Sequence, residues 1–214
     1  MPLTDKITMP DTSSVYIWHI EETEAQLKEK YKQLIAQGGF EEEVENIKVL
    51  RKRKQWYASR LLSFEVIPDF KGLYYDQFGA PHLIEDDRCV SYSHSHDKVA
   101  LIIHDDHEVG IDIQREDEKL RRISSKFLNE QEAERFIDSG ESLDYLHVLW
   151  SVKETVFKVH KHHMPFKEIR TAESVDAQQG VMKVVANRFD GPHNHEVHFH
   201  KLNGYFVAHC CYTD

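Results

Sequence analysis

The pattern of apolar and polar positions along this chain predicts alternating strands and helices. Val15 to Ile20 has the composition of a strand, and the Thr23-x-x-Gln26 spacing that follows is typical of a helix capping box. Short apolar runs bounded by polar turns predict further strands at 73–75, 89–93, 99–104, 109–113, 169–175, 181–185, 197–202 and 205–212. Helical periodicity and start signals predict helices at 23–38, 44–67, 117–127, from 129 onward, and 143–160.

The order of these elements predicts a chain with two similar halves. The strands at 99–104 and 109–113 are expected to form a hairpin across the polar stretch Asp105 to Glu108, at the centre of a sheet. The second half then repeats the mixture of strands and helices found in the first. We therefore place the domain boundary in this stretch, which gives an N-terminal half of residues 1–106 and a C-terminal half of residues 107–214.

Composition narrows the class of protein. With 214 residues, 40% of them hydrophobic and 30% charged, the chain is typical of a globular protein with a real core. No apolar run approaches the ~20 residues of a membrane span, and the start of the chain lacks the features of a signal peptide, so we expect a cytoplasmic protein that does not bind membranes. The three cysteines are expected to be reduced thiols.

The net charge of -10 argues against nucleic acid as the main partner. Positive charge is nevertheless concentrated in the helix expected at 44–67, where Arg53 and Arg60 lie two turns apart on a common stripe. Such a stripe can bind a small polyanion. An ordinary solvated face with ion pairs explains the same pattern equally well. The basic residues of this segment are Lys48, Arg51, Lys52, Arg53, Lys54 and Arg60.

Two segments forty residues apart contain the residues with the clearest chemistry. In Val109 to Gln114, the period of two that strands have turns Gly110, Asp112 and Gln114 to one face, so an acid and an amide oxygen lie side by side. Oxygen pairs of this kind suit Mg²⁺. Taken alone, Asp112 is more simply explained as a hairpin residue bonded to a neighbour.

The second segment, Trp150 to Lys158, lies in the helix expected at 143–160. Trp150, Glu154 and Lys158 are spaced i, i+4 and i+8 and share a face, which Lys153 flanks. If this helix packs beside the strand, Asp112 and Glu154 would bind Mg²⁺ and the lysines would contact phosphate oxygens. The simpler alternative for Glu154 and Lys158 is an i, i+4 salt bridge worth ~0.3 to 0.5 kcal/mol.

Together the two segments resemble the hallmark motifs of the 4'-phosphopantetheinyl transferase superfamily, Gly-x-Asp and Trp-x-x-Lys-Glu-x-x-x-Lys. The first is present as Gly110-Ile111-Asp112 and the second as Trp150 to Lys158. Ser93 and His94 are similar to the family's Ser-His segment, Arg60 to its helix arginine, and Phe127 with Glu130 to the region between the hallmarks.

The length of the chain is similar to that of the larger, monomeric surfactin-synthetase type of this superfamily. That resemblance implies an α+β fold in which two similar α/β halves are related by pseudo-two-fold symmetry, with the active site at their junction. Two positions differ from the family pattern. Gln114 stands where many members have glutamate, which bears on metal affinity, and Ala80 replaces a lysine that contacts coenzyme A.

The resemblance implies that 4'-phosphopantetheine is transferred from coenzyme A to a serine of an acyl- or peptidyl-carrier protein, with release of adenosine 3',5'-bisphosphate. Asp112, Glu154 and Gln114 would bind Mg²⁺, and Lys153 and Lys158 would contact the pyrophosphate of coenzyme A. Glu154 would be the base that activates the serine, and Lys158 would stabilise the leaving group. Arg60, Ser93 and His94 would bind the nucleotide end.

Two other classes of function remain open. The abundance of histidines allows a transition-metal-binding module. Alternation at Val197 and Phe199 instead predicts that His198 and His200 simply face outward from a strand. A non-catalytic adaptor for carrier proteins is the third class. The histidines concerned are His160, His162, His163, His193, His195, His198 and His200.

Overall fold

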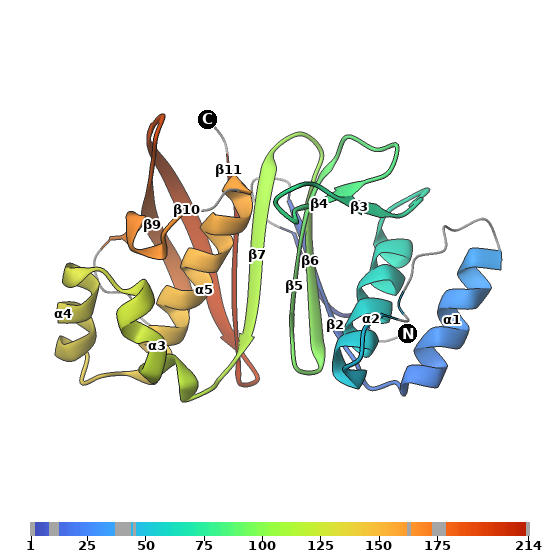
Figure 1. Ribbon diagram of the computed structural model, residues 1–214, viewed down its shortest axis with the longest axis horizontal. Helices are drawn as coiled ribbons and strands as arrows, with labels where there is room; N and C mark the ends of the chain where they lie inside the picture. Colours follow the sequence, from blue (N-terminus) through green and yellow to red (C-terminus); the bar gives the residue numbers. More distant parts are fainter. Residues whose placement is uncertain are drawn as a thin grey trace. The chain divides into compact units, whose positions relative to one another are not determined.

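The computed structural model describes residues 3–8, 13–36, 44, 46–161, 164–172 and 179–212. The chain divides into two compact units, Met1–His107 and Glu108–Asp214, and this division lies one residue from the boundary expected from the sequence. Across the described residues the fold is a mixture of five α-helices and strands in three sheets (Figure 1).

Unit 1 contains a four-stranded antiparallel sheet with the strand order β1-β2-β6-β5, and a separate two-stranded sheet of β3 and β4. Helix α1 begins at the expected capping box, because Gln26 N–H donates to Thr23 Oγ1 (3.3 Å) and Thr23 N–H donates to Gln26 Oε1 (2.9 Å). The elements are β1 (Leu3–Thr8), β2 (Ser14–His19), α1 (Glu24–Ala36), α2 (Leu50–Val66), β3 (Leu73–Tyr75), β4 (Pro81–Leu83), β5 (Cys89–Ser95) and β6 (Lys98–His104).

The core of unit 1 lies between its two helices and one face of the four-stranded sheet. Trp18 of β2 and Leu101 of β6 pack with Leu27 of α1 and Leu62 of α2, and all four side chains are buried. Helix α2 starts at Leu50, later than the expected start at residue 44, and ends before the proline at position 68, which cannot continue a helix.

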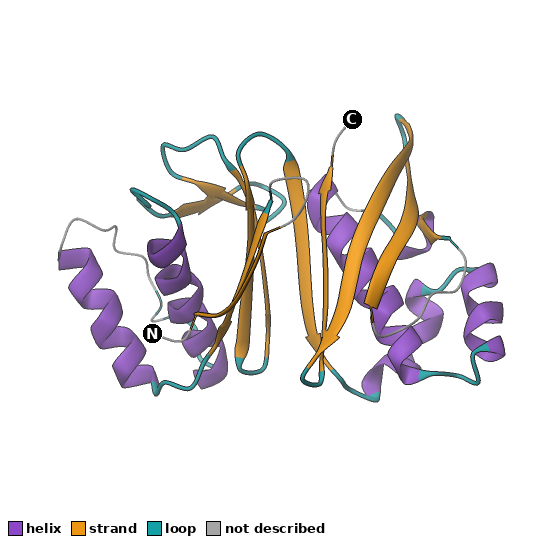
Figure 2. Cartoon of the chain, turned by 180° about the vertical axis from the view of Figure 1, so that it is seen from behind, coloured by secondary structure: helices purple, strands orange, loops and turns teal. Residues whose placement is uncertain are grey.

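Unit 2 contains a five-stranded antiparallel sheet with the strand order β7-β11-β10-β9-β8. Helix α5 begins at an N-cap residue, Ser142, whose Oγ accepts from Tyr145 N–H (3.3 Å). It packs along this sheet against β7, β11 and β10 (Figure 2). The elements are β7 (Glu108–Arg115), α3 (Lys119–Phe127), α4 (Glu130–Asp138), α5 (Leu143–His160), the 3₁₀ turn η1 (Phe166–Glu168), β8 (Ile169–Thr171), β9 (Gln179–Arg188), β10 (Gly191–Leu202) and β11 (Tyr205–Tyr212).

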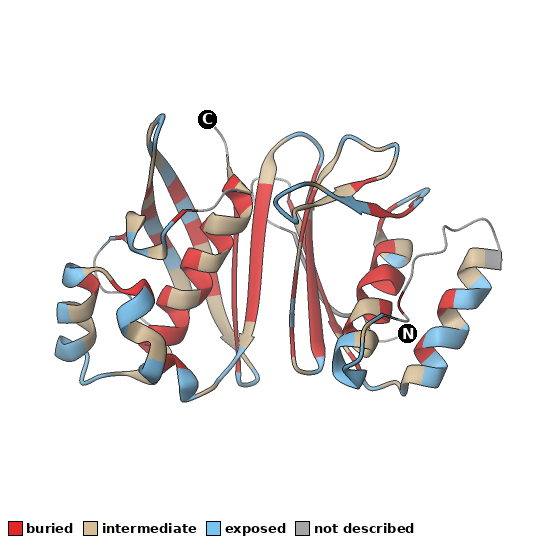
Figure 3. Cartoon of the chain, in the orientation of Figure 1, coloured by how far each residue is buried: buried red, intermediate tan, exposed pale blue. Residues whose placement is uncertain are grey.

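The expected hairpin across Asp105 to Glu108 is wrong. β6 pairs with β2 and β5, whereas β7 pairs with β11, which lies about a hundred residues later in the chain. The local pattern identified both strands correctly, but a short polar connection does not determine which strand pairs with which. Both strands are buried along most of their length (Figure 3), because β6 lies inside its sheet and β7 is covered by α5.

Two simpler expectations concern the cysteines and the membrane. Cys89 lies in β5 and Cys210 and Cys211 lie in β11, and none of the three is in a disulfide among the described residues. A search of the described helices found none with the length and apolar character that crossing a membrane requires.

Candidate functional site

The first hallmark segment forms β7, and its register with β11 fixes the position of each side chain. Gly110 lies opposite Cys210 and Asp112 lies opposite Ala208 in this antiparallel pair. Val109, Ile111 and Ile113 are fully buried, and Asp112 is itself only 5% exposed. A carboxylate at this position is therefore almost removed from water, which is costly unless it has charged or hydrogen-bonding partners.

Gly110 lets the second hallmark segment approach this strand. A Cβ atom at position 110 would lie 2.2 Å from the carbonyl oxygen of Thr155 and 2.9 Å from Cγ2 of Val159, both on α5. Only glycine leaves room for a helix backbone at this distance. Thr155 Oγ1 in turn donates to the carbonyl of Ala208 (3.0 Å), so α5 is bound to the neighbouring strand β11 at the same level.

This close approach brings Lys158 onto the carboxylate of Asp112. Lys158 Nζ donates to Oδ1 of Asp112 (3.1 Å) and to the carbonyl of Ile111 (2.7 Å). The side chain of Lys158 keeps a quarter of its surface exposed, whereas that of Asp112 is 7% exposed. The cation therefore lies on the open side of the pair, where it can also meet an anion from solution.

Glu154 completes the cluster, one turn before Lys158 on the same helix. Burial raises the pKa of Glu154 to about 7, the charge of Lys158 opposes this rise, and the negative charge of Asp112 adds to it. Asp112, Glu154 and Lys158 thus lie within electrostatic reach of one another, as the sequence predicted. One lysine faces two carboxylates, so the cluster has a deficit of positive charge at neutral pH.

The donor set fits a hard divalent cation. Mg²⁺ prefers carboxylate oxygens together with water and phosphate oxygens, and two carboxylates that repel each other are relieved by such an ion. Gln114 lies in the same strand as Asp112, two residues further on, and is half-buried. Its amide oxygen is a neutral donor of the same hard type.

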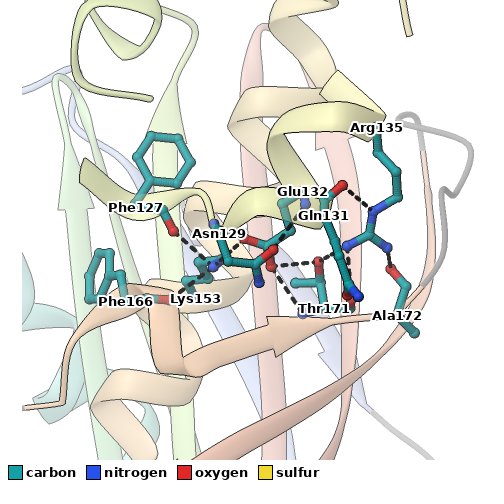
Figure 4. Close-up of polar contacts among 9 residues, drawn as sticks. All are labelled: Phe127, Asn129, Gln131, Glu132, Arg135, Lys153, Phe166, Thr171 and Ala172. Atoms are coloured by element: carbon teal, nitrogen blue, oxygen red, sulfur yellow. Dashed lines mark hydrogen bonds and ion pairs between the residues drawn. The ribbon is translucent and has the colours of Figure 1, made fainter. Parts of the chain in front are cut away.

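Lys153 lies elsewhere, which corrects the expectation that it contacts the pyrophosphate. Its ammonium group is fully buried and donates to the carbonyl of Phe127 (2.9 Å), to Oε2 of Glu132 (2.6 Å) and to the carbonyl of Phe166 (2.9 Å), as Figure 4 shows. An ammonium group has three N–H donors, so none is left for a phosphate oxygen. Lys153 is therefore not in the proposed phosphate-binding set. Sequence periodicity gave no sign of these three acceptors.

The residues expected at the nucleotide end all lie in unit 1. Arg60 is buried at 5% exposure, with its guanidinium 4.5 Å from the ring centroid of Trp56 and Nη2 donating to the hydroxyl of Tyr75 (3.1 Å). Ser93 is buried and His94 is exposed, because neighbouring residues of β5 point to opposite faces of the sheet. The two side chains therefore do not share one surface.

The basic stripe on α2 is only partly available to an anion. Arg53 is bound by the carboxylate of Glu24 and donates to the carbonyls of Ile47 (2.9 Å) and Lys48 (3.0 Å), so the ion-pair alternative holds for this residue. A pocket of about 300 Å³ nevertheless opens at the start of α2. It is lined by Ile20, Leu50, Arg51, Lys54, His96 and Asp97.

The histidines cluster in a way that the sequence did not predict. His160 at the end of α5 and His195 in β10 lie with their Nε2 atoms 2.8 Å apart, and Arg188 donates to Nδ1 of His160 (2.9 Å). Because arginine only donates, His160 must have its proton on Nε2, and that nitrogen has no lone pair for a metal.

The other histidines do not join this pair. His198 and His200 are half-buried beside the buried Val197 and Phe199, as the alternation predicted. His162 and His163 lie outside the described residues.

One group in unit 1 has the composition of a metal site. His104, Asp106 and His107 bring ligand atoms within 4.8 Å of one another at the end of β6. Nδ1 of His104, however, accepts the backbone N–H groups of Asp106 (3.2 Å) and His107 (3.0 Å). Its single lone pair thus stabilises the turn, so this nitrogen is not available to a metal.

Comparison with known families agrees with the hallmark segments. Residues 108–211, which are nearly the whole of unit 2, match the family model described as the 4'-phosphopantetheinyl transferase superfamily. A comparison with curated proteins found no match. The matched range includes the strand β7 with Asp112 and the helix α5 with Glu154 and Lys158.

Proposed function

We propose that this protein transfers 4'-phosphopantetheine from coenzyme A to a serine hydroxyl of an acyl- or peptidyl-carrier protein. The single observation that supports this most strongly is the cluster of Asp112, Glu154 and Lys158, which combines a nearly buried carboxylate, a second carboxylate with a pKa of about 7 and a lysine that keeps a quarter of its surface exposed. The family match over residues 108–211 supports phosphopantetheine transfer in general.

In this proposal Asp112 and Glu154, with Gln114, hold Mg²⁺, which when bound neutralises charge on the pyrophosphate of coenzyme A. Lys158 faces the same pyrophosphate and stabilises the charge that develops on the leaving adenosine 3',5'-bisphosphate. The serine oxygen forms a bond to the β-phosphorus, and the bond from that phosphorus to the bridging oxygen of the pyrophosphate breaks. Arg60, Ser93 and His94 are the residues proposed for the nucleotide end, but Ser93 and His94 point to opposite faces of β5, so only one of those two can contact it directly.

Glu154 is the proposed acceptor of the serine proton, directly or through a water molecule. A general base is most effective when its pKa lies near the working pH, and burial brings that of Glu154 to about 7. Bound metal would lower this value, so the pKa applies to the protein before the metal binds. The proton leaves the serine as the new oxygen–phosphorus bond forms.

The proposal is tested by incubating the pure protein with apo-carrier proteins, coenzyme A and Mg²⁺ and measuring the intact mass of the carrier. We expect a phosphopantetheine mass increment with the wild-type protein and none with Asp112→Ala or Glu154→Ala. Asp106→Ala, an exposed acid in the turn before β7, is the control and should keep activity. Near wild-type turnover by either of the first two variants at saturating Mg²⁺ would remove the metal assignment.

The adaptor alternative predicts carrier binding with no mass increment in any condition. The transition-metal alternative has little support from the described histidines, since Arg188 fixes the tautomer of His160. The cluster itself does not contain the surface that recognises a carrier protein, so the transfer assay should use a panel of apo-carrier proteins rather than one.

A further inference from the structure

Lys153 is next to Glu154 in the chain, yet it lies in a different environment. Its side chain is fully buried, and its three acceptors belong to three segments: Phe127 at the end of α3, Glu132 in the first turn of α4, and Phe166 at the start of η1. One ammonium group therefore ties helix α5 to each of these segments (Figure 4). Burial lowers the pKa of Lys153, and the carboxylate of Glu132 opposes this effect.

Glu132 extends the network to the sheet of unit 2. Its Oε2 also accepts the backbone N–H of Asn129 (2.9 Å), and its Oε1 accepts both the N–H (3.1 Å) and the hydroxyl (2.9 Å) of Thr171 in β8. Arg135, one turn further along α4, donates to the carbonyls of Thr171 (3.0 Å) and Ala172. The ion pair thus connects α5 to the sheet through α4 and β8.

This pair is not exchangeable for an apolar pair of the same size. Many buried ion pairs can be replaced by well-packed apolar side chains with no loss of stability. Here such a replacement would leave the carbonyls of Phe127 and Phe166 and the N–H groups of Asn129 and Thr171, which are buried or partly buried, without these partners. The two carbonyls need the ammonium group of Lys153 as a donor, and the two N–H groups need the carboxylate of Glu132 as an acceptor.

Helix geometry relates this network to the cluster around Asp112. Successive residues of an α-helix are turned by about 100°, so Lys153 and Thr155 point about 200° apart, nearly to opposite sides, and Glu154 points between them. Thr155 is bound to β11 through the carbonyl of Ala208 and packs on Gly110. Lys153 is bound on the other side. Glu154 is therefore flanked in the chain by two anchors that together prevent α5 from turning about its axis.

We propose that the Glu132–Lys153 ion pair is a positioning device that fixes the direction in which Glu154 leaves α5 and so aligns it with Asp112. Lys153 is thus a positioning residue rather than a phosphate ligand. This inference rests on the proposed function for its kinetic consequences, but its geometric content concerns the divalent-cation site alone.

The test compares Lys153→Met and Glu132→Gln with Lys167→Met. Lys167 is exposed in η1, close in the chain to the same network, and gives a matched loss of one lysine charge. Each variant is studied at a temperature where unfolding curves show that it is folded. Two quantities are measured on folded protein: kcat and KM for coenzyme A, and the Kd for Mn²⁺ as a spectroscopic probe of the cation site.

A positioning role predicts that Lys153→Met lowers kcat by about 10- to 100-fold with KM for coenzyme A changed by less than about 2-fold, because small misplacements of a reacting group cost that much. It also predicts a Kd for Mn²⁺ raised about 10-fold or more, as expected when a group supporting a metal ligand is lost. Glu132→Gln should change both quantities in the same direction, and Lys167→Met neither.

A purely structural role would lower the unfolding temperature but leave kcat and the Kd for Mn²⁺ of the folded protein at wild-type values, and that result would overturn the inference. If Lys153→Met does not fold, Glu132→Gln decides, since it keeps the shape of the side chain. If the wild-type protein transfers nothing from coenzyme A, the proposed function fails, and the comparison of Mn²⁺ affinities still decides whether the ion pair positions Glu154.

Discussion

At the scale of single residues, the glycine of the first hallmark segment shows how one missing side chain shapes a site. Lys158 reaches Asp112 because α5 lies directly against β7 at Gly110. The Gly-x-Asp pattern is thus explained by two physical needs, one at Gly110 and one at Asp112, which lie next to each other on the same face of β7. The first position must be empty so that the helix can approach, and the second must bear the carboxylate that the helix lysine meets.

Gly110→Ala should therefore displace α5. Its new Cβ would meet a backbone oxygen at 2.2 Å, which cannot move without the helix, so we expect a loss of about 1–3 kcal/mol in the free energy of unfolding and a large loss of transfer activity. Gly180→Ala is the control in a strand of the same sheet, because its Cβ would meet only the ring of Phe199 at 3.1 Å. Urea unfolding of both variants measures the difference. Equal stabilities would mean that α5 tolerates a shift at this point.

The carboxyl group of Glu154 gives a second prediction at this scale. Its pKa rises from 4.5 to about 7 in the folded protein because of burial, with Asp112 adding and Lys158 opposing. A raised acid pKa means that its contribution to stability is complete below pH 4.5 and is lost as the pH rises through 7. At about 1.4 kcal/mol per pKa unit, the loss is on the order of 3–4 kcal/mol.

Glu154→Gln cannot titrate, so in metal-free buffer the stability of the wild-type protein relative to this variant should fall between pH 4.5 and pH 8. Urea unfolding of the two proteins at several pH values measures this difference, in which all other titrating groups cancel. A difference that does not change with pH would show that Glu154 is not held in a buried environment. Adding Mg²⁺ should reduce the effect, because the ion favours the charged carboxylate.

At the scale of elements, the end of α5 is joined to β10 by two buried imidazoles. Burial lowers the pKa of His160 to about 3, with His195 and Arg188 adding to the effect, and burial lowers the pKa of His195 to about 4, with His193 adding. Asp190, which is bonded to Nε2 of His193 (3.0 Å), opposes the shift of His160. Both rings are therefore neutral in the folded protein at neutral pH, while the unfolded chain protonates them below about 6.5.

A lowered histidine pKa means that stability is complete above pH 6.5 and is lost as the pH falls toward 4. We expect the urea midpoint of the wild-type protein to fall over this range, and to fall less steeply for His195→Gln, which removes one of the two titrating rings. His198→Gln, a half-buried position of the same strand, should keep the wild-type pH dependence. The same slope in all three proteins would contradict the assignment of acid sensitivity to this pair.

Elements with strong local signals could be predicted from the sequence, and contacts between distant segments could not. The bounds of α5 and β11 match the prediction, because an N-cap, a helical period and an Asn-Gly turn all act locally. The partner of β7 and the acceptors of Lys153 are set by segments far away in the chain. Spacing placed Lys153 correctly on α5 but did not show that its side chain points into the interior. β1 was missed because its sequence, LTDKIT, has only two apolar residues and so gives a weak pattern, and β4 was missed because it has only three residues.

At the scale of the whole molecule, the residues proposed for catalysis lie in unit 2, and those proposed for the nucleotide end lie in unit 1. The family match covers residues 108–211, whereas Arg60, Ser93 and His94 lie in unit 1. The net charge of -10 should repel both coenzyme A and acidic carrier proteins, so local positive charge must attract each of them. We expect unit 1 to supply this charge for the nucleotide and α3 of unit 2 to supply it for the carrier.

On α3 the contacts of the two arginines indicate which of them is available to a carrier protein. Arg121 donates to Glu118 (2.7 Å) and to the carbonyl of Glu141 (2.6 Å), so much of its charge is already engaged. Arg122 is exposed, and no hydrogen bond or ion pair is found for it among the described residues. Lys126, in the last turn of the same helix, is also exposed. Arg122 should therefore contribute more to carrier association than Arg121.

Kinetic measurements in which coenzyme A and the carrier protein are varied in turn can distinguish the proposed nucleotide-binding residues of unit 1 from the proposed carrier-binding residues of α3. Arg60→Ala should raise the KM for coenzyme A with little change in the KM for the carrier, because Arg60 is the cation of unit 1 proposed to bind the nucleotide end. Arg122→Ala should raise the KM for the carrier and weaken the salt dependence of carrier association, since exposed charges act mainly by steering the encounter. Arg121→Ala is the matched control on α3 and should have the smaller effect. If Arg60→Ala and Arg122→Ala shift the KM of the same substrate, the assignment of nucleotide and carrier to separate surfaces is wrong.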